Sequence, residues 1–222
     1  MQQVFVKLFL VLCFTSIQVP LPLYGMDLPE GVRPLVMTQG NSLASHVSSG
    51  TIFLNEPSII EEFLEKLEGT SPNWKYLYGS NVDERYDRLF EEMEKRDKAR
   101  IGHALLNQHI AFVWYGNLTS YRAEYRGFGV AIGPMKIQTN WGIVRFKISN
   151  APFEMVAVPS ADQLKTIQDR RTRGEEINIQ IMYSGSLMEA ESVLFDFSTE
   201  KEGEGMILPI VMLDQVDYML IE

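Results

Sequence analysis

The sequence predicts an α+β protein in which N-terminal amphipathic helices are followed by a small antiparallel β-barrel that is OB-like, of the oligomer-binding type. The first observation is a change of hydrophobic period: apolar residues recur every three to four positions in residues 55–109 and every second position in residues 110–222. These periods are typical of amphipathic helices and of half-buried strands. The second observation is one helical pattern between Val158 and Ile177. A helix inserted between strands favours the barrel over its alternative, a twisted antiparallel sheet with helices on one face.

Residues 1–25 have the layout of a secretory signal peptide. Lys7 precedes the apolar run 8–14, and a turn-prone stretch that contains Pro20 and Pro22 follows it. A membrane span needs about 20 apolar residues, so this run is too short, and no later segment supplies them. We therefore expect an exported chain, periplasmic or secreted, with no transmembrane segment after removal of the signal peptide.

Composition limits the compartment and the partners of this protein. The single cysteine, Cys13, lies inside the predicted signal peptide, so the exported chain would carry no disulfide. That pattern fits a bacterial cell envelope better than a small eukaryotic secreted module. The chain has 29 acidic and 20 basic residues, a net charge of -9. Nucleic acid is not expected as a partner, because its binding needs clustered positive charge.

Residues 26–54 are predicted to be a flexible leader. They combine prolines with a small polar run at 41–51 and show no sustained period, as flexible tethers do. Two short apolar groups, 32–37 and 52–54, leave open the alternative that the leader adds an edge strand to the sheet.

Residues 55–109 are predicted to be a helical region. A first helix ends at Gly69, and a second begins near Asn81 or Asp83. The charge run 83–100 of the second helix is most simply a solvated face with ion pairs, and a docking surface for a protein partner is the alternative. The apolar stripe expected on the second helix consists of Tyr86, Leu89, Phe90 and Met93.

Residues 110–222 are predicted to be a β-rich, barrel-like domain. The cleanest strand alternation lies in the segment 177–183. The inserted helix begins at a capping box formed by Ser160 and Gln163 and ends at Gly174. Pro209 predicts an edge or a bulge in the closing apolar run.

The layout resembles a group of uncharacterised exported bacterial proteins known only as a domain of unknown function. The resemblance runs from Asn55 to Glu222. It rests on the two leading helices, on the segment Phe112 to Val130 with its spaced tyrosines and glycines, and on the closing strand that ends in Asp217, Tyr218, Met219 and Leu220. It implies no activity, cofactor or catalytic residue.

No motif in the sequence indicates a catalytic, cofactor or metal site. Residues 184–186, Ser-Gly-Ser, lack the flanking glycines of a hydrolase nucleophile and are interpreted as a hairpin turn. His103 and His109 are six residues apart, whereas zinc ligands on a helix are three or four apart. Asp214 and Asp217 interrupt an apolar strand, which indicates a bulge or an exposed rim.

The candidate binding residues are aromatic and basic side chains in the predicted barrel. Tyr121 and Tyr125 alternate with arginines, so they are interpreted as core tyrosines backed by solvated arginines. A ligand face of the barrel would still be sought on this strand and on the one that follows residue 140. The candidates are Tyr121, Tyr125, Trp141, Arg145 and Lys147.

These observations favour a non-enzymatic bacterial envelope protein that binds a protein partner in the envelope or a small ligand. The alternative is a periplasmic hydrolase whose site is assembled from residues remote in sequence. A concave polar pocket that gathers His109 with a serine or with two carboxylates would favour the hydrolase. A filled barrel with an exposed apolar groove would favour binding.

Overall fold

The computed structural model describes residues 32–37, 43, 47, 49–79, 84–196 and 205–221. The predicted signal peptide, residues 1–25, and part of the predicted leader lie outside the described residues. No helix within the described ranges is both long enough and apolar enough to cross a membrane.

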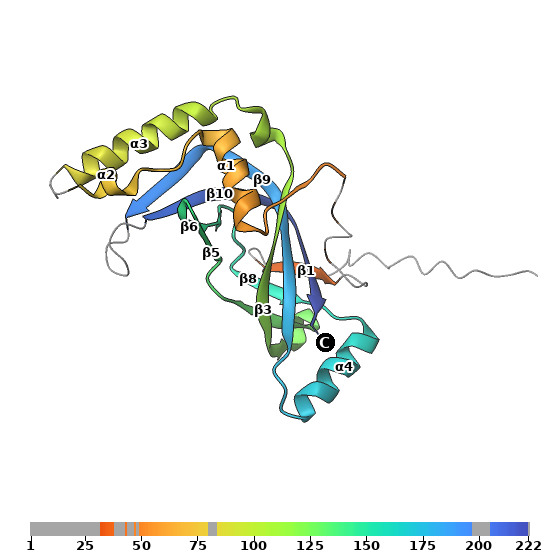
Figure 1. The fold of residues 1–222 in the computed structure, drawn as a ribbon. Helices are drawn as coiled ribbons and strands as arrows, with labels where there is room; N and C mark the ends of the chain where they lie inside the picture. The colour runs from red at the N-terminus through yellow and green to blue at the C-terminus, as the bar shows by residue number, and fades with distance from the viewer. Residues whose placement is uncertain are drawn as a thin grey trace, which may run out of the picture.

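Within the described residues the fold is α+β, with helices and one mixed, strongly curled sheet of ten strands (Figure 1). The α-helices are α1 (Pro57–Glu68), α2 (Trp74–Tyr78), α3 (Arg85–Arg100) and α4 (Ala161–Thr172). The strands are β1 (Val32–Met37), β2 (Ile52–Phe53), β3 (Ile110–Arg122), β4 (Gly127–Ile132), β5 (Lys136–Thr139), β6 (Gly142–Arg145), β7 (Lys147–Ile148), β8 (Glu154–Ala157), β9 (Asn178–Asp196) and β10 (Gly205–Leu220). Both short apolar groups of the predicted leader are strands of this sheet.

A long antiparallel hairpin of β9 and β10 forms the centre of the sheet. On its outer side β9 pairs antiparallel with β3, and β4 and β8 follow in order, each antiparallel to its neighbour. The other edge of β10 is shared by three short parallel strands, β6, β7 and β1. Because β1 also pairs with β8, the pairings run in a ring through β1, β8, β4, β3, β9 and β10.

The prediction of an antiparallel sheet is wrong for four of the strands. Strands β1, β2 and β7 pair parallel to their neighbours, and β6 pairs parallel with β10 but antiparallel with β5. A period of two identifies a half-buried strand, but it is the same for a parallel and an antiparallel partner. The direction of these short strands is set by long-range chain connections that the local pattern does not contain.

The interpretation of Ser184, Gly185 and Ser186 as a hairpin turn is also wrong. They lie inside β9, which continues through them for 19 residues. A side chain at Gly185 would collide with the backbone of Met212 and Leu213 on β10. Glycine serves here for a close approach of two strands, beside a register shift of the hairpin between Leu213 and Gln215, and not for turn geometry.

The helices begin and end near the positions that the sequence signals predict. Helix α1 has Pro57 in its first turn and ends at Gly69, whose φ of 93° suits glycine. Helix α4 begins at the predicted capping box, in which Ser160 and Gln163 exchange hydrogen bonds. Helices α1, α2 and α3 lie together at one end of the β9–β10 hairpin, and α4 lies at the other end (Figure 1).

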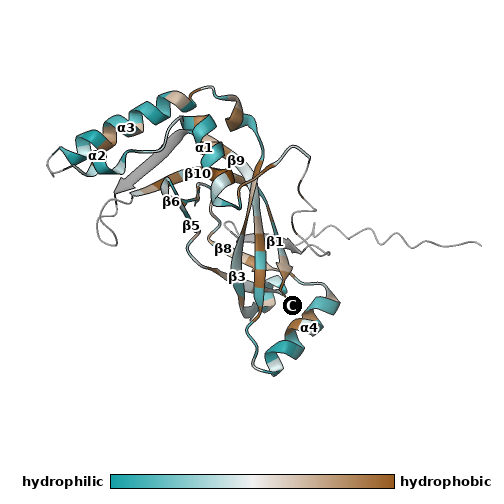
Figure 2. Cartoon of the chain, in the orientation of Figure 1, coloured by the Kyte–Doolittle hydropathy of each residue, from teal (hydrophilic) through white to brown (hydrophobic). Residues whose placement is uncertain are grey.

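Helix α3 differs from its predicted pattern. Leu89 is buried, but Tyr86 and Phe90 of the predicted apolar stripe are 67% and 65% exposed. Figure 2 shows α3 as hydrophilic along most of its length. Near its C-terminal end, however, Arg96 and Arg100 are fully buried, so the interpretation of the whole charge run as a solvated face is wrong there.

Glu68, Arg96 and Arg100 form a buried ionic group, which we call the Glu68 cluster. The two carboxylate oxygens of Glu68 accept from Arg96 Nη1 at 2.8 Å and from Arg100 Nη1 at 3.1 Å. The second terminal nitrogen of Arg96 donates to the carbonyl of Thr70, and that of Arg100 to the carbonyl of Met188 on β9. Burial lowers the pKa of the Arg100 guanidinium, and the Glu68 carboxylate acts in the opposite direction. The cluster therefore joins α1, α3 and β9.

Removal of the Glu68 charge should strongly destabilise the protein. In Glu68→Gln the buried Arg100 loses its carboxylate partner and Arg96 keeps only Glu92, and breaking a buried ion pair costs about 3–5 kcal/mol. We expect a loss of that size in the free energy of unfolding, measured by urea denaturation. Glu62→Gln on the same helix is the control, because Glu62 pairs with Lys66 at the exposed surface, and we expect no measurable change there. Equal effects of the two substitutions would contradict the structural role of the cluster.

Candidate functional site

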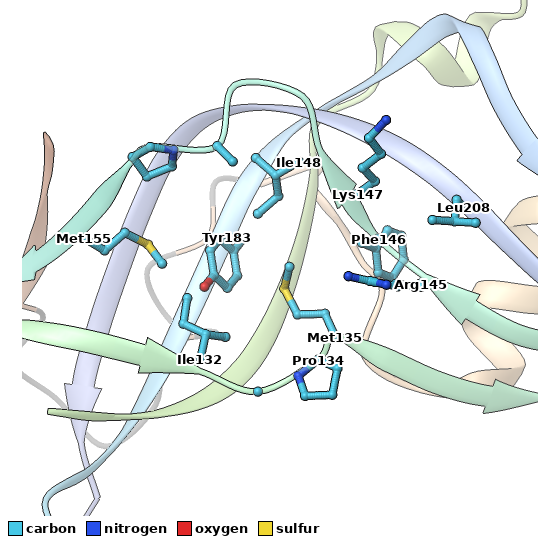
Figure 3. A pocket seen from close by; sticks show the side chains of 13 residues that line it. Ile132, Pro134, Met135, Arg145, Phe146, Lys147, Ile148, Met155, Tyr183 and Leu208 are labelled. Atoms are coloured by element: carbon cyan, nitrogen blue, oxygen red, sulfur yellow. The ribbon is translucent and has the colours of Figure 1, made fainter. Parts of the chain in front are cut away.

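A pocket of about 640 Å³ lies where the chain between β4 and β8 passes over the β9–β10 hairpin (Figure 3). Its volume falls within the range of small-molecule sites. Most of the lining side chains are apolar. They are Ile132, Pro134, Met135, Phe146, Ile148, Ala151, Pro152, Met155 and Leu208, with the backbone of Gly133. The polar members of the lining are Arg145, Lys147 and Tyr183.

One wall of the pocket is a chain segment that is fixed to β10 at three places. Strand β6 pairs with the start of β10, and β7 pairs with it again after Pro209. Beyond β7, the side chain of Asn150 forms two hydrogen bonds with the backbone of β10. Its Oδ1 accepts from the N–H of Leu213 at 2.9 Å, and its Nδ2 donates to the carbonyl of Leu213 at 2.8 Å. The wall is therefore held by the hairpin and does not depend on side-chain packing alone.

Tyr183 forms part of the floor of the pocket. Its ring is fully buried on β9 and stacks on Phe112 with 5.2 Å between ring centroids, and Phe112 stacks in turn on Phe146 at 4.7 Å. Its buried hydroxyl has no hydrogen-bond partner within the described part of the chain. Burial raises the pKa of this phenol, so it stays neutral at physiological pH.

Two methionines lie beside Tyr183 in the pocket, and Figure 3 shows Met155 on one side of the ring and Met135 on the other. Methionine side chains have three rotatable bonds and adapt to irregular contacts. An unpartnered buried hydroxyl loses its hydrogen bonds to water without replacement. A ligand that moves these side chains and offers a polar atom to Tyr183 would restore one such bond.

Arg145 and Lys147 supply the positive charge of the pocket. Both side chains are exposed, while Phe146 between them is buried. Neither forms an ion pair or side-chain hydrogen bond with another residue that the structure describes. Among the residues that the structure describes, no aspartate or glutamate lines the pocket, although the chain carries a net charge of -9.

The other three predicted binding residues lie outside this pocket. Tyr121 is 45% exposed, and its ring meets Phe128 edge-on at 5.1 Å. Tyr125 lies in a short 3-10 turn at 123–125. The expectation of core tyrosines is wrong. Tyr121 lies in β3 after a register shift against β4 and is exposed, and Tyr125 lies beyond the end of β3 at Arg122, where the alternation stops.

Trp141 has a structural environment. Its side chain is buried, its carbonyl accepts from Nε1 of Trp74 at 2.7 Å, and the guanidinium of Arg96 lies 5.5 Å from its ring centroid. Of the five predicted residues, the structure thus brings Arg145 and Lys147 to one pocket. Tyr183 is not among the predicted residues, although it occupies an inward position in the cleanest alternation of the chain.

A second polar group lies outside the pocket and joins His109, Asp214 and Thr51; it is called the His109 group. Nε2 of His109 lies 2.8 Å from Oδ2 of Asp214, and Nδ1 lies 3.1 Å from Oγ1 of Thr51. Asp214 is placed by the register shift in β10, which agrees with its prediction as a bulge. The side chains of His109 and Asp214 are 37% and 58% exposed. A hydroxyl, an imidazole and a carboxylate in this order form the arrangement of a nucleophile, its base and an orienting acid.

Metal ligands do not gather in the described ranges, where no group of three or more histidine, cysteine or acidic side chains could hold an ion. The other histidine of the helical region, His103, accepts from the backbone N–H of Leu105 at 3.2 Å. Asp217, by contrast with Asp214, is buried and accepts from Gln215 Nε2 at 2.6 Å.

No known protein family, no curated protein sequence and no solved structure matches this chain.

Proposed function

We propose that this protein is an exported bacterial envelope protein, periplasmic or secreted, that acts as a non-enzymatic module and binds a small ligand. The signal-peptide layout of residues 1–25 and the single cysteine within it support export. The observation that carries the binding function is the pocket over the β9–β10 hairpin. It combines apolar walls with two cations and a buried hydroxyl that have no side-chain partner among the described residues.

The order of the strands supports the proposal that the sheet is an OB-like barrel. Strands β3, β4 and β8 follow one another as antiparallel neighbours, α4 comes next, and the β9–β10 hairpin returns with β9 beside β3. The helix thus lies between the third and fourth of these five strands. Barrels of this type bind ligands on the face of their second and third strands. Ile132 of β4 and Met155 of β8, which line the pocket, belong to those two strands.

We also propose that the protein has a protein partner in the cell envelope and that nucleic acid is not a partner. The excess of acidic over basic residues opposes binding to a phosphate backbone. The outer face of α3 supports a protein partner through its exposed charged side chains, such as Glu94 and Lys98.

Binding in the pocket is tested with N-phenyl-1-naphthylamine, a neutral apolar dye that fluoresces in apolar surroundings. We expect saturable binding to the purified protein. Ala151→Trp fills the mouth of the pocket from an exposed loop position, and we expect it to weaken dye binding by roughly tenfold or more, about 1.4 kcal/mol.

Ala99→Trp is the matched control, because Ala99 is exposed on α3 and does not line the pocket. It should bind the dye as the unchanged protein does. Absence of saturable binding, or equal binding by the two tryptophan variants, would contradict the proposed function.

A second candidate function is a periplasmic hydrolase whose site is assembled from sequence-remote residues, and the His109 group favours it. The oxygen of Thr51 would attack an acyl carbon, its proton would pass to His109, and the alcohol or amine would leave with a proton returned from the imidazole. Asp214 would hold and stabilise the imidazolium. Water would then release the acyl group from Thr51.

The hydrolase candidate predicts turnover of p-nitrophenyl butyrate that depends on this group. A general base contributes at least about a hundredfold to rate, so His109→Ala and Thr51→Ala should each lower the rate by roughly that factor. His103→Ala is the control, because His103 lies outside the group and should leave the rate unchanged. Equal rates for the two histidine variants would exclude this function for the His109 group.

A further inference from the structure

We propose that the ligand of the pocket is a single-chain anionic amphiphile, whose acid group is bound by Arg145 and Lys147 and whose apolar body lies against Met135 and Met155. This inference rests on the proposed ligand-binding function and goes beyond it by naming the chemical class of the ligand.

The charge of the pocket is the first argument. Arg145 and Lys147 have no acidic partner among the described residues, and no acid is present in the lining. In an acidic chain, two neighbouring unpaired cations at an apolar pocket create a local site for an anion. A carboxylate suits Arg145, because a guanidinium binds both of its oxygens with two parallel hydrogen bonds, and Lys147 adds a second positive charge to the lining.

The position of the two cations gives the orientation of the ligand. Both are exposed, so they bind an acid group at the rim, where water still solvates it. Phe146, which lies between them in the sequence, is buried, and its ring stacks on the ring of Phe112. A ligand whose acid group is held at the rim therefore extends its body over the apolar lining of the pocket.

The apolar lining is the second argument. Ile132, Met135, Ile148 and Met155 surround the buried ring of Tyr183 in Figure 3. Flexible methionines admit a chain of variable shape more readily than branched side chains do. A small polar anion such as inorganic phosphate would leave this surface unused, whereas an aliphatic chain of an amphiphile would remove it from water.

The hydroxyl of Tyr183 is the third argument. It is neutral, buried and without a hydrogen-bond partner among the described residues. It therefore offers one polar contact at the floor, remote from the cations at the rim. A chain that carries a hydroxyl at its far end would satisfy it, which predicts that 12-hydroxydodecanoate binds more tightly than dodecanoate.

The test measures displacement of the neutral dye by dodecanoate and by dodecanol, which share the chain length and differ in the head group. We expect dodecanoate to displace the dye at concentrations roughly tenfold lower than dodecanol. Arg145→Gln combined with Lys147→Gln should remove this preference while dye binding stays intact. In the unchanged protein, high salt should reduce the preference for dodecanoate over dodecanol, because salt screens the exposed charges.

The control is Lys75→Gln combined with Lys165→Gln, which lowers the net charge by the same amount at two exposed positions outside the pocket. It should keep the preference for the acid. Tyr183→Phe should remove the advantage of 12-hydroxydodecanoate over dodecanoate without changing the preference of dodecanoate over dodecanol.

The outcomes separate this inference from the proposed function. If the dye binds and is displaced equally well by dodecanoate and dodecanol, the inference of an anionic ligand is overturned and the binding function stands. Absence of dye binding would overturn both. Binding to vesicles that contain phosphatidylglycerol without displacement of the dye by dodecanoate would indicate a membrane surface as partner and would also overturn the inference.

Discussion

The antiparallel pairing of β9 with β10 is the interaction on which the rest of the structure depends. It is the longest pairing in the sheet, running from Ile179 opposite Leu220 to Asp196 opposite Gly205. The free edges of the hairpin then bind β3 on one side and β6, β7 and β1 on the other. The geometry of the pocket and of the His109 group depends on this pairing, because Tyr183 lies on β9 and Asp214 lies at a register shift of β10. A pocket built on such a frame is preformed, which reduces the ordering cost of binding.

The helices are tied to this frame by charge as well as by apolar packing. Helix α1 buries an apolar face, but α3 contributes few buried apolar side chains and is strongly hydrophilic. The Glu68 cluster compensates for this small apolar contact of α3. Its two arginines also donate to the carbonyls of Thr70 and Met188, which leaves few buried polar atoms unpaired. Buried ionic groups need this nearly complete set of hydrogen bonds to be tolerated. The helical end of the molecule is therefore positioned by the apolar face of α1 together with the directional contacts of α3, while the pocket end is positioned by strand pairing.

Local signals predicted the elements well and their partners poorly. The three-to-four period located α1, and the capping box of Ser160 located the start of α4, because both signals are contained within a few neighbouring residues. The parallel strands, the burial of Arg96 and Arg100 and the position of Gly185 depend on contacts between segments far apart in sequence. In the pocket, Arg145 and Lys147 were found through their composition and alternation. Tyr183 was not found, because the alternation pattern does not distinguish a tyrosine that lines a pocket from an apolar residue that packs in the core.

The central claim is that the buried hydroxyl of Tyr183 has no partner among the described residues and forms a hydrogen bond when a ligand supplies one. The free energy of unfolding of Tyr183→Phe, compared with that of the unchanged protein without ligand, tests this most directly. An unpaired hydroxyl gives no hydrogen bond in the folded state, so its removal should leave stability unchanged or raise it by up to about 1 kcal/mol. Tyr183→Leu, which removes the stacking on Phe112, should lower stability and shows that the measurement responds at this position. A loss of about 1 kcal/mol or more in Tyr183→Phe would show that the hydroxyl is already bonded and would contradict the account.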